Sequence, residues 1–217
     1  RDVLVALDVS RSLLADDVAP DLLSLARLLV RSLADELQGE RLGLLPFAGT
    51  AFLQSPLSAD YEIFRTFLDE LGPDMIPAGG SDFAALLSAA DEAFGLSDSG
   101  PQPSGLGSQV SGFGAQPSGP AAPPPADRFL VVLSDGEAQD ESWRPLAQKL
   151  AERGVRVIAL GLGTAAGAMI PDGKGGLVKD PAGAVVLSRL EAGTLRELAR
   201  LTEGDALDGR GAVQHAV

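Results

Sequence analysis

The chain has 217 residues, which is enough for one large domain or for one domain that carries an insertion. Its formal net charge of −13 argues against nucleic acid as a partner, because nucleic-acid-binding proteins neutralise phosphates with Lys and Arg. It contains no cysteine, which excludes disulfides, zinc–thiolate sites, iron–sulfur clusters and cysteine nucleophiles.

The hydrophobic content is high and aliphatic. Hydrophobic residues make up 45% of the chain and aromatic residues only 5%, so we expect a core of Leu, Val, Ala and Ile, typical of parallel strands covered by helices. No apolar run approaches the roughly 18 residues of a membrane-spanning helix, and we expect no membrane contact by this segment itself. No signal peptide is visible at Arg1-Asp2, and the abrupt ends suggest a domain taken from a longer chain.

The first half of the chain alternates short apolar runs with amphipathic stretches. Residues 2–7 have the pattern of a buried strand, which ends at Asp8. A second strand is predicted over residues 41–47, and a short third strand, antiparallel to the second, over residues 50–54. Helices are predicted over residues 18–37, 61–71 and 82–94.

A change of composition separates the two halves. Residues 97–127 are dominated by Pro, Gly, Ser, Ala and Gln, and we interpret them as a disordered insertion within a single domain, residues 1–217. Beyond them the alternation resumes, with a Gly-rich β-hairpin excursion inside residues 161–184. Strands are predicted over residues 129–133, 155–160 and 205–207, and helices over residues 143–153 and 191–201.

The alternation of strand and helix favours an α/β fold. We predict a doubly wound, Rossmann-like, mainly parallel sheet of six strands with helices on both faces and one antiparallel edge strand. In such sheets ligands bind beyond the carboxyl ends of the strands. Asp8 and Asp135 both follow strands and should therefore lie along that edge.

Oxygen-bearing side chains follow these strands with a regular spacing. Asp8, Ser10 and Ser12 occupy alternate positions after the first strand, a glycine pair precedes Ser81, and Asp135 follows the strongest strand pattern. Two carboxylates and three hydroxyls form a set of hard ligands that suits Mg²⁺, Mn²⁺ or Ca²⁺. Two carboxylates only balance a dication, so the metal would stay electrophilic and accept a further anionic oxygen.

Each of these residues also has a simpler structural interpretation. Ser10 and Ser12 are residue types that commonly cap helices or line turns. Ser81 could cap the helix that follows it, and Asp82 could interact favourably with that helix dipole. The appearance of all of them together, in order and on the expected elements, favours the metal site.

The pattern Asp8-x-Ser10-x-Ser12, a hydroxyl residue after Gly79-Gly80, and Leu133-Ser134-Asp135-Gly136 resembles the metal-ion-dependent adhesion site of von Willebrand factor A domains. The resemblance covers nearly the whole chain apart from the Pro/Gly/Ser-rich insertion. Where this sequence has Ser81, the family usually has Thr, so we expect coordination to survive with looser positioning. Residues 6–12, 16–20, 47–52, 56–57 and 60–68 are similar to bacterial Bat-type aerotolerance proteins.

The resemblance implies a binding function and not an enzymatic one. It implies that Ser10, Ser12 and Ser81 coordinate the metal, that Asp8 and Asp135 bind it directly or through water, and that a partner's Asp or Glu supplies the last ligand. It further implies partners among other Bat-type proteins and a MoxR-type AAA+ ATPase system. The expected location is the extracytoplasmic (periplasmic) face of the inner membrane, with tethering helices outside this sequence.

Other functions fit the sequence less well. A phosphatase with Asp8 as nucleophile would require a second carboxylate two residues on, where Ser10 stands. Residues 161–167 contain the glycine spacing of a dinucleotide-binding loop but are followed by turn-like residues and not by a helix. The sole histidine, His215, argues against serine hydrolase chemistry. An interaction scaffold with a silent or purely structural metal site stays open as an alternative.

Overall fold

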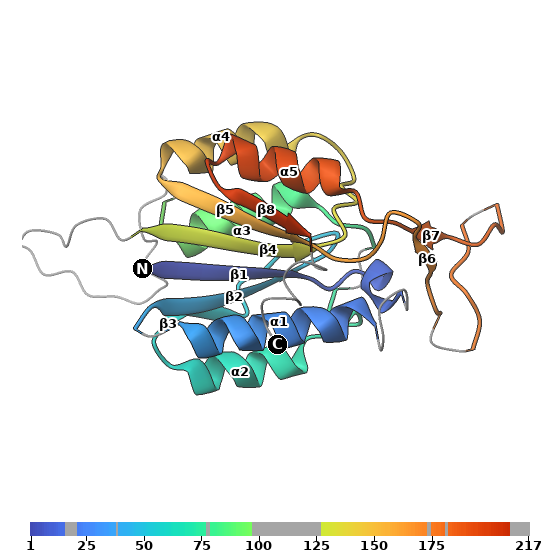
Figure 1. Ribbon diagram of the computed structural model, residues 1–217, viewed down its shortest axis with the longest axis horizontal. Helices are drawn as coiled ribbons and strands as arrows, with labels where there is room; N and C mark the ends of the chain where they lie inside the picture. Colours follow the sequence, from blue (N-terminus) through green and yellow to red (C-terminus); the bar gives the residue numbers. More distant parts are fainter. Residues whose placement is uncertain are drawn as a thin grey trace, which may run out of the picture.

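Six strands form a single sheet at the centre of the molecule (Figure 1). A computed structural model describes residues 1–15, 21–37, 39–76, 79–96, 127–172, 175–180 and 182–208. The strand order is β3-β2-β1-β4-β5-β8, and every neighbouring pair is parallel except β2 and β3. The strands are β1 (Asp2–Asp8), β2 (Arg41–Phe47), β3 (Ser55–Ser58), β4 (Arg128–Ser134), β5 (Val155–Gly161) and β8 (Asp205–Asp208).

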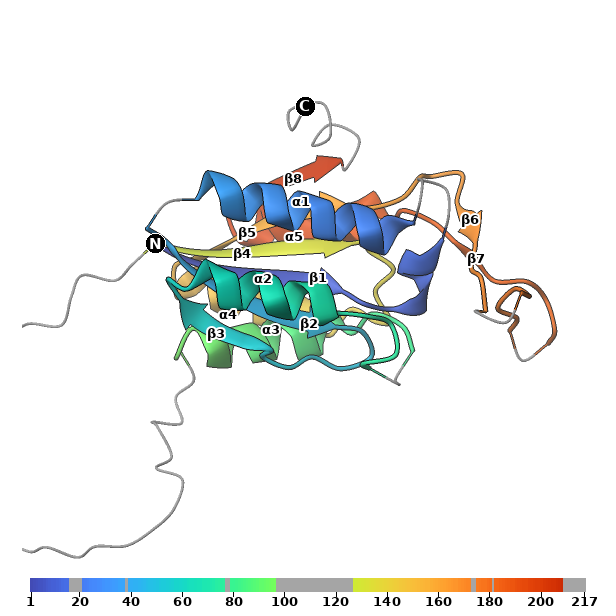
Figure 2. The same cartoon turned by 90° about the horizontal axis from the view of Figure 1, so that it is seen from below.

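Helices cover both faces of this sheet, as Figures 1 and 2 show. One face packs against α1 and α2, and the other against α3, α4 and α5. The predicted fold class, a doubly wound and mainly parallel six-stranded sheet with one antiparallel edge strand, is therefore confirmed. The helices are η1 (Arg11–Leu14), α1 (Leu22–Glu36), α2 (Tyr61–Glu70), α3 (Phe83–Ala93), α4 (Trp143–Glu152) and α5 (Ala192–Leu201).

The strand β1 shows why the sheet is buried on both sides. All seven of its residues are buried, and successive side chains point to opposite faces. Val3 and Val5 therefore join the core under α1 and α2, while Leu4 and Ala6 join the core under α3 to α5. Both cores contain aromatic residues, and in the core under α3 to α5 the ring centroid of Phe83 lies 5.6 Å from that of Phe47 and 6.4 Å from that of Trp143.

The third strand lies further along the chain than the sequence indicated. The predicted bounds, residues 50–54, are wrong, because that segment forms no regular strand. It turns the chain back beside β2 through an isolated pairing of Phe47 with Ala51 and hydrogen bonds from the Phe52 and Gln54 amides to β2 carbonyls. The regular antiparallel strand is β3, and its register against β2 shifts near Gly43. A Cβ at Gly43 would lie 3.0 Å from Leu4 and 3.1 Å from a β3 carbonyl, so glycine permits this close approach.

The first long helix also begins later than predicted. Asp21 caps α1 by accepting a 2.7 Å hydrogen bond from the Ser24 amide, so the helix starts at Leu22. The part of the predicted helix at residues 18–20 lies outside the described residues, as does the predicted insertion apart from Asp127. No helix within the described ranges is both long and apolar enough to cross a membrane.

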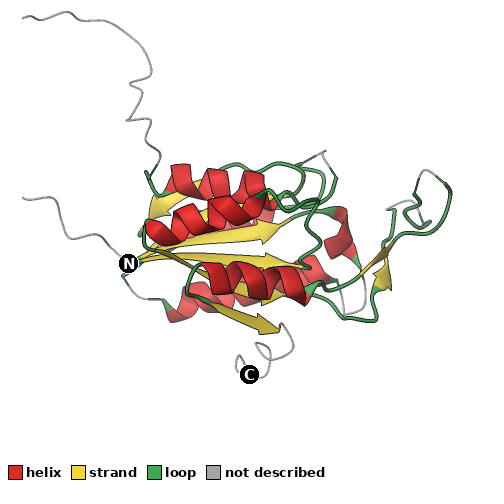
Figure 3. Cartoon of the chain, turned by 90° about the horizontal axis from the view of Figure 1, so that it is seen from above, coloured by secondary structure: helices red, strands yellow, loops and turns green. Residues whose placement is uncertain are grey.

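The predicted hairpin excursion is present between β5 and α5. Its base pairs β6 (Ala168–Met169) with β7 (Leu187–Ser188) in antiparallel fashion, and further pairings join Pro171 with Leu177 and Lys179 with Val185. The hairpin projects from the edge at which the parallel strands end (Figures 1 and 3). The carboxyl edge of the sheet therefore carries a protruding element, as well as loops.

Candidate metal site

The five predicted ligands come together at the carboxyl edge of the sheet. Asp8 ends β1, Ser10 and Ser12 follow it, Ser81 precedes α3, and Asp135 follows β4. β1 and β4 are parallel neighbours, which brings the ends of the two strands side by side. We refer to these five residues as the candidate metal site.

Asp8 is the centre of a buried hydrogen-bond network. Its side chain is completely buried. Its Oδ2 accepts hydrogen bonds from the hydroxyls of Ser81 (2.8 Å) and Ser134 (2.7 Å), and its Oδ1 accepts one from the Ser10 amide (2.9 Å). Asp8 is thereby held in one orientation by residues from two loops and from the end of β4.

The hydroxyls of the site lie within hydrogen-bond reach of one another. Ser10 Oγ and Ser12 Oγ are 2.7 Å apart, and Ser81 Oγ lies 3.5 Å from Ser10 Oγ. The Ser12 side chain also lies near Asp135 and counteracts the rise in the pKa of that carboxyl. The structure thus brings all five predicted residues together in one polar cluster.

Close packing between two loops holds Ser81 in place. The Ser81 carbonyl accepts a 3.3 Å hydrogen bond from the Gln139 amide, and the Gln139 side chain donates one of 2.8 Å to the Gly79 carbonyl. Gly80 adopts a φ of +84° directly against the Gln139 side chain, where a Cβ would collide. Gly80 of the glycine pair therefore allows the loop conformation that brings the Ser81 hydroxyl to Asp8, whereas a Cβ at Gly79 would meet no atom within 4 Å.

Asp135 is fixed by the hairpin as well as by its own loop. Its Oδ1 accepts a hydrogen bond from the Glu137 amide (3.1 Å) and its Oδ2 accepts one from the Ser188 hydroxyl (3.2 Å). The Asp135 carbonyl accepts a further hydrogen bond of 2.7 Å from the Glu191 amide. The segment that joins the hairpin to α5 is therefore fastened to the candidate metal site.

The electrostatics of the site favour a bound cation. Burial, reinforced by the charge of Asp135, raises the pKa of Asp8 to about 7, and burial raises the pKa of Asp135 as well. Neither carboxylate forms an ion pair with any Lys or Arg among the described residues. Two buried acids without a basic partner are costly when ionised, and a cation would relieve that cost.

The donor chemistry fits a hard divalent ion held by few charges. The described part of the chain contains no group of three or more His, Cys, Asp or Glu arranged for a metal. The candidate metal site instead offers two carboxylates and three serine hydroxyls. All of these are oxygen ligands, the type that Mg²⁺, Mn²⁺ and Ca²⁺ accept.

Two residues of this network were not predicted from the sequence. Ser134 donates to Asp8 and accepts a 3.0 Å hydrogen bond from the Gly136 amide. Its position directly before Asp135 was a usable signal. Ser188 reaches Asp135 from 53 positions away, and no local pattern pointed to it.

Residues beside the site have structural roles. Asp82, and not Ser81, caps α3 by accepting a 2.9 Å hydrogen bond from the Ala85 amide. Ser10 precedes η1 but makes no side-chain cap bond. Glu137, which the sequence places beside the site, accepts a 2.9 Å hydrogen bond from the Arg189 amide. The simple capping interpretation therefore holds for Asp82 and does not account for Ser10 or Ser81.

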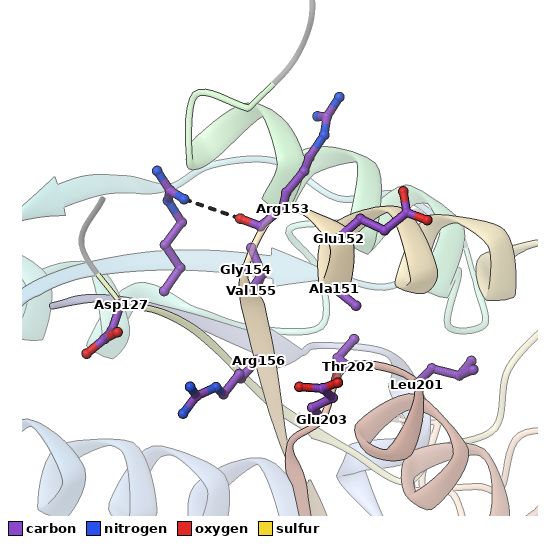
Figure 4. A pocket seen from close by; sticks show the side chains of 11 residues that line it. Asp127, Ala151, Glu152, Arg153, Gly154, Val155, Arg156, Leu201, Thr202 and Glu203 are labelled. Carbon is purple, nitrogen blue, oxygen red and sulfur yellow. Dashed lines mark hydrogen bonds between the residues drawn. The ribbon is translucent and has the colours of Figure 1, made fainter. Parts of the chain in front are cut away.

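A cavity lies at the opposite edge of the sheet (Figure 4). It has a volume of about 630 Å³ and sits at the amino ends of β4 and β5. Arg128 lines it and donates a 3.3 Å hydrogen bond to the Arg153 carbonyl. Three arginines and three acids line it, so it offers no concentrated charge, and it shares no residue with the candidate metal site.

The similarity to known proteins agrees with this geometry. Residues 3–105 match the model of the von Willebrand factor type A domain. The whole chain superposes on the solved structure of BatB from Bacteroides thetaiotaomicron with a TM-score of 0.80 and 29% identity, covering 99% of this chain and 95% of that one. The chain has the fold of a von Willebrand factor type A (VWA) domain. Its resemblance to Bat-type proteins, expected from the sequence motifs, is confirmed.

Two further relatives bear on this VWA domain. An aerotolerance-related membrane protein from Bacteroides fragilis, solved with multiple mutations to serines, matches at 27% identity and a TM-score of 0.78, covering 99% of this chain and 98% of that one. A UPF0353 protein of Mycobacterium avium is 35% identical over 103 residues, and that match covers 46% of this chain and 31% of the relative. The chain thus spans about a third of the curated relative's length.

A more distant likeness shows the fold alone. The proximal thread matrix protein 1 of the mussel byssus, solved with a zinc-occupied MIDAS motif, matches this VWA domain at 16% identity and a TM-score of 0.63. The match covers 99% of this chain and 46% of that one. In that protein the motif holds zinc.

Proposed function

We propose that this VWA domain is a divalent-cation-dependent protein–protein interaction module. In this proposal the ion, Mg²⁺ or alternatively Mn²⁺ or Ca²⁺, is held by the candidate metal site. The observation that carries the proposal is the pair of buried carboxylates, Asp8 and Asp135, which share one hydroxyl network and have no basic partner among the described residues.

The charge balance of the site explains what a bound ion would do. Asp8 and Asp135 carry two negative charges at most, while Ser10, Ser12 and Ser81 contribute neutral oxygens. The bound ion would therefore retain enough positive potential to attract an acidic side chain of a partner. Because the site lies among buried residues, that attraction would be screened less than at an open surface.

Binding suits the residues of this site better than catalysis does. Asp8 is the one carboxylate placed like a nucleophile at a strand end, yet its oxygens accept three hydrogen bonds and are completely buried. Ser10 occupies the position at which a phosphatase of this geometry would carry its general acid. We therefore propose that the domain acts without turnover.

The biological setting that we propose follows from the Bat-type relatives. One of them is described as an aerotolerance-related membrane protein. We propose that this domain is tethered at the extracytoplasmic face of the inner membrane and acts in a stress-tolerance or chaperone-like assembly. The proposed partners are other Bat-type proteins and a MoxR-type AAA+ ATPase system, one of which would supply the Asp or Glu carboxylate.

Isothermal titration with Mg²⁺ and Mn²⁺ tests the metal site. The wild-type domain should bind about one ion, and the double variant Asp8→Ala, Ser10→Ala should not. A matched control is Asp60→Ala, Ser58→Ala, which removes an acid and a hydroxyl from the cap of α2 and should leave binding unchanged. Both variants must first show the wild-type circular dichroism spectrum.

The alternative is an interaction scaffold whose metal site is silent or purely structural. If the folded wild-type domain binds neither ion, or if EDTA leaves partner binding intact, the scaffold becomes the better account. The titration shows whether an ion is bound, and the EDTA experiment shows whether a bound ion takes part in partner binding.

A further inference from the structure

The hairpin between β5 and α5 carries an unusual surface. It spans residues 168–188, of which 173, 174 and 181 lie outside the described residues. Large hydrophobic side chains gather on it with much of their surface in solvent. Their exposed fractions are 51% for Met169, 36% for Leu177, 44% for Val185 and 40% for Leu187.

The register of the hairpin puts these four side chains on one face. Directly paired residues of antiparallel strands point to the same side, and alternate residues along a strand do so as well. Met169 pairs with Leu187, Pro171 with Leu177, and Lys179 with Val185. The four therefore form a common surface, the apolar hairpin face, which consists of Met169, Leu177, Val185 and Leu187.

The opposite face of the hairpin is turned toward the domain. Ile170 and Ser188 alternate with the exposed residues and are buried, and Ala168 packs against the core under α1 and α2. Gly167 at the base has a φ of +77°, and a Cβ there would lie 2.5 Å from the Ser188 carbonyl oxygen. The hairpin is thus seated firmly at its base and presents its apolar face outward.

The hairpin that carries this surface is attached at its base to the candidate metal site. The hydroxyl of Ser188, next to Leu187, donates to Asp135, and the following residue, Arg189, donates its amide to Glu137. The hairpin projects beyond the strand ends at the same edge as the site (Figures 1 and 3). A protein that reaches an ion at Asp8 and Asp135 would therefore meet the hairpin as well.

The described charges of the hairpin region are balanced, with two acids and two cations. Both described acids of its turns are used locally: Asp172 accepts a 2.8 Å hydrogen bond from the Gly176 amide, and Asp180 one of 2.9 Å from the Ala184 amide. The cations Lys179 and Arg189 are exposed, and Lys179 lies on the same side as the apolar hairpin face. The hairpin region is therefore less acidic than the chain as a whole, whose net charge is −13.

We propose that the apolar hairpin face is a second contact for the same protein partner and selects partners whose acidic residue is flanked by aliphatic side chains. This inference rests on the proposed metal-dependent function and adds the chemistry by which the partner is recognised. The metal alone would require only a carboxylate, which many protein surfaces offer. Apolar contact beside it would supply selectivity, because aliphatic surface buried next to the ion contributes affinity that a bare carboxylate lacks.

The test uses linear peptides with a central Glu and randomised flanks, selected on the immobilised domain in Mg²⁺. We expect peptides enriched in Leu, Ile, Val or Met at particular flanking positions, with binding lost in EDTA or when the central Glu is replaced by Gln. The variant Met169→Ser, Leu187→Ser should bind a selected peptide about tenfold more weakly. Selection on that variant should return Glu-containing peptides without the apolar enrichment.

A matched control removes equal hydrophobic surface elsewhere. Leu28 and Ile63 are 61% and 49% exposed on α1 and α2, so Leu28→Ser, Ile63→Ser should leave peptide affinity and selection unchanged. Circular dichroism and Mg²⁺ titration of both variants should match the wild type. These measurements confirm that the hairpin variant keeps its fold and its ion.

The outcomes distinguish this inference from the proposed function. Mg²⁺- and Glu-dependent binding with identical flank preferences in wild type and hairpin variant would overturn the apolar contact and leave the metal-bridged module standing. Absence of any Mg²⁺- and Glu-dependent binding would overturn both. Cosedimentation with phosphatidylcholine–phosphatidylglycerol vesicles that disappears in the hairpin variant would assign the face to lipid and overturn the protein contact.

Discussion

The hydroxyl of Ser81 donates a 2.8 Å hydrogen bond to Oδ2 of Asp8, although 73 positions separate the two residues in the sequence. The contact ties the end of β1 to the loop before α3. It also places a hydroxyl beside the completely buried carboxylate of Asp8. Substitutions at Ser81 therefore test the site without removing a charge.

Ser81→Ala should weaken Mg²⁺ binding about 10- to 100-fold, because it removes an oxygen donor and one of the bonds that orient Asp8. Ser81→Thr should retain binding, since the hydroxyl stays and the added methyl restricts its rotation. Isothermal titration of both variants provides the comparison. Equal affinity of Ser81→Ala and wild type would remove Ser81 from the ligand set.

The buried acids predict an unusual pH dependence of stability without metal. The pKa of Asp8 is raised from its ordinary value of 3.8 to about 7. Between these values the folded state binds more protons than the unfolded state, so the free energy of unfolding should fall as pH rises from about 4 to about 7. One such group contributes at most about 1.4 kcal/mol per pH unit.

Urea unfolding in EDTA across this pH range, for wild type and for Asp8→Asn, isolates the contribution of Asp8. The free energy of unfolding of Asp8→Asn, minus that of wild type, should increase as the pH rises. Saturating Mg²⁺ should reduce or reverse the trend, because the ion stabilises the ionised form. A wild type whose free energy of unfolding in EDTA rises with pH relative to Asp8→Asn would contradict the raised pKa.

Ser134 should act by positioning Asp8 and not as a ligand. Its hydroxyl donates to Asp8 Oδ2 and accepts from the Gly136 amide, so Ser134→Ala leaves two buried polar groups short of a partner. We expect a loss of about 1–3 kcal/mol in the free energy of unfolding. The loss of Mg²⁺ affinity should be smaller than for Ser81→Ala. A larger effect of Ser134→Ala in the titration would make Ser134 a ligand candidate.

Gly167→Ala should loosen the hairpin. Gly167 and Gly175 both have positive φ, of +77° and +87°, but only at Gly167 would a Cβ meet other atoms, within 2.5 Å of the Ser188 carbonyl oxygen. Gly175→Ala therefore carries the backbone cost alone, roughly 1–2 kcal/mol. Hydrogen exchange at the Val186 amide, which bonds to Val178, should accelerate more in Gly167→Ala. Equal exchange rates in the two variants would contradict this account.

The sequence predicts the parallel strands well because burial on both faces produces uninterrupted apolar runs, such as residues 2–7 and 129–133. Edges are harder. β3 is a short edge strand, half exposed and containing Pro56, so its pattern is weak and the prediction fell on the preceding turn. Its position depends on a register against β2 that a local pattern does not encode.

The residues of the candidate metal site also differ in how well the sequence predicts them. Asp8, Ser10, Ser12, Ser81 and Asp135 are recognisable because each follows or precedes a regular element with a family-like spacing. Ser188 is not, because it approaches Asp135 only through the fold of the hairpin. Similarly, the Gly-rich composition of residues 161–184 indicated a hairpin, but which side chains share its exposed face followed only from the observed pairings.

Leu96 and Asp127, which flank residues 97–126, lie far from the edge of the sheet that carries the candidate metal site. Leu96 follows α3, and its carbonyl accepts a hydrogen bond from Arg153 beside the cavity of Figure 4. Asp127 precedes β4, and its carbonyl accepts a 2.9 Å hydrogen bond from the Asp2 amide at the start of β1. A fluorophore or affinity handle introduced next to Leu96 or Asp127 would leave the opposite edge free, which makes these two positions suitable for immobilising or labelling the protein while partners are screened.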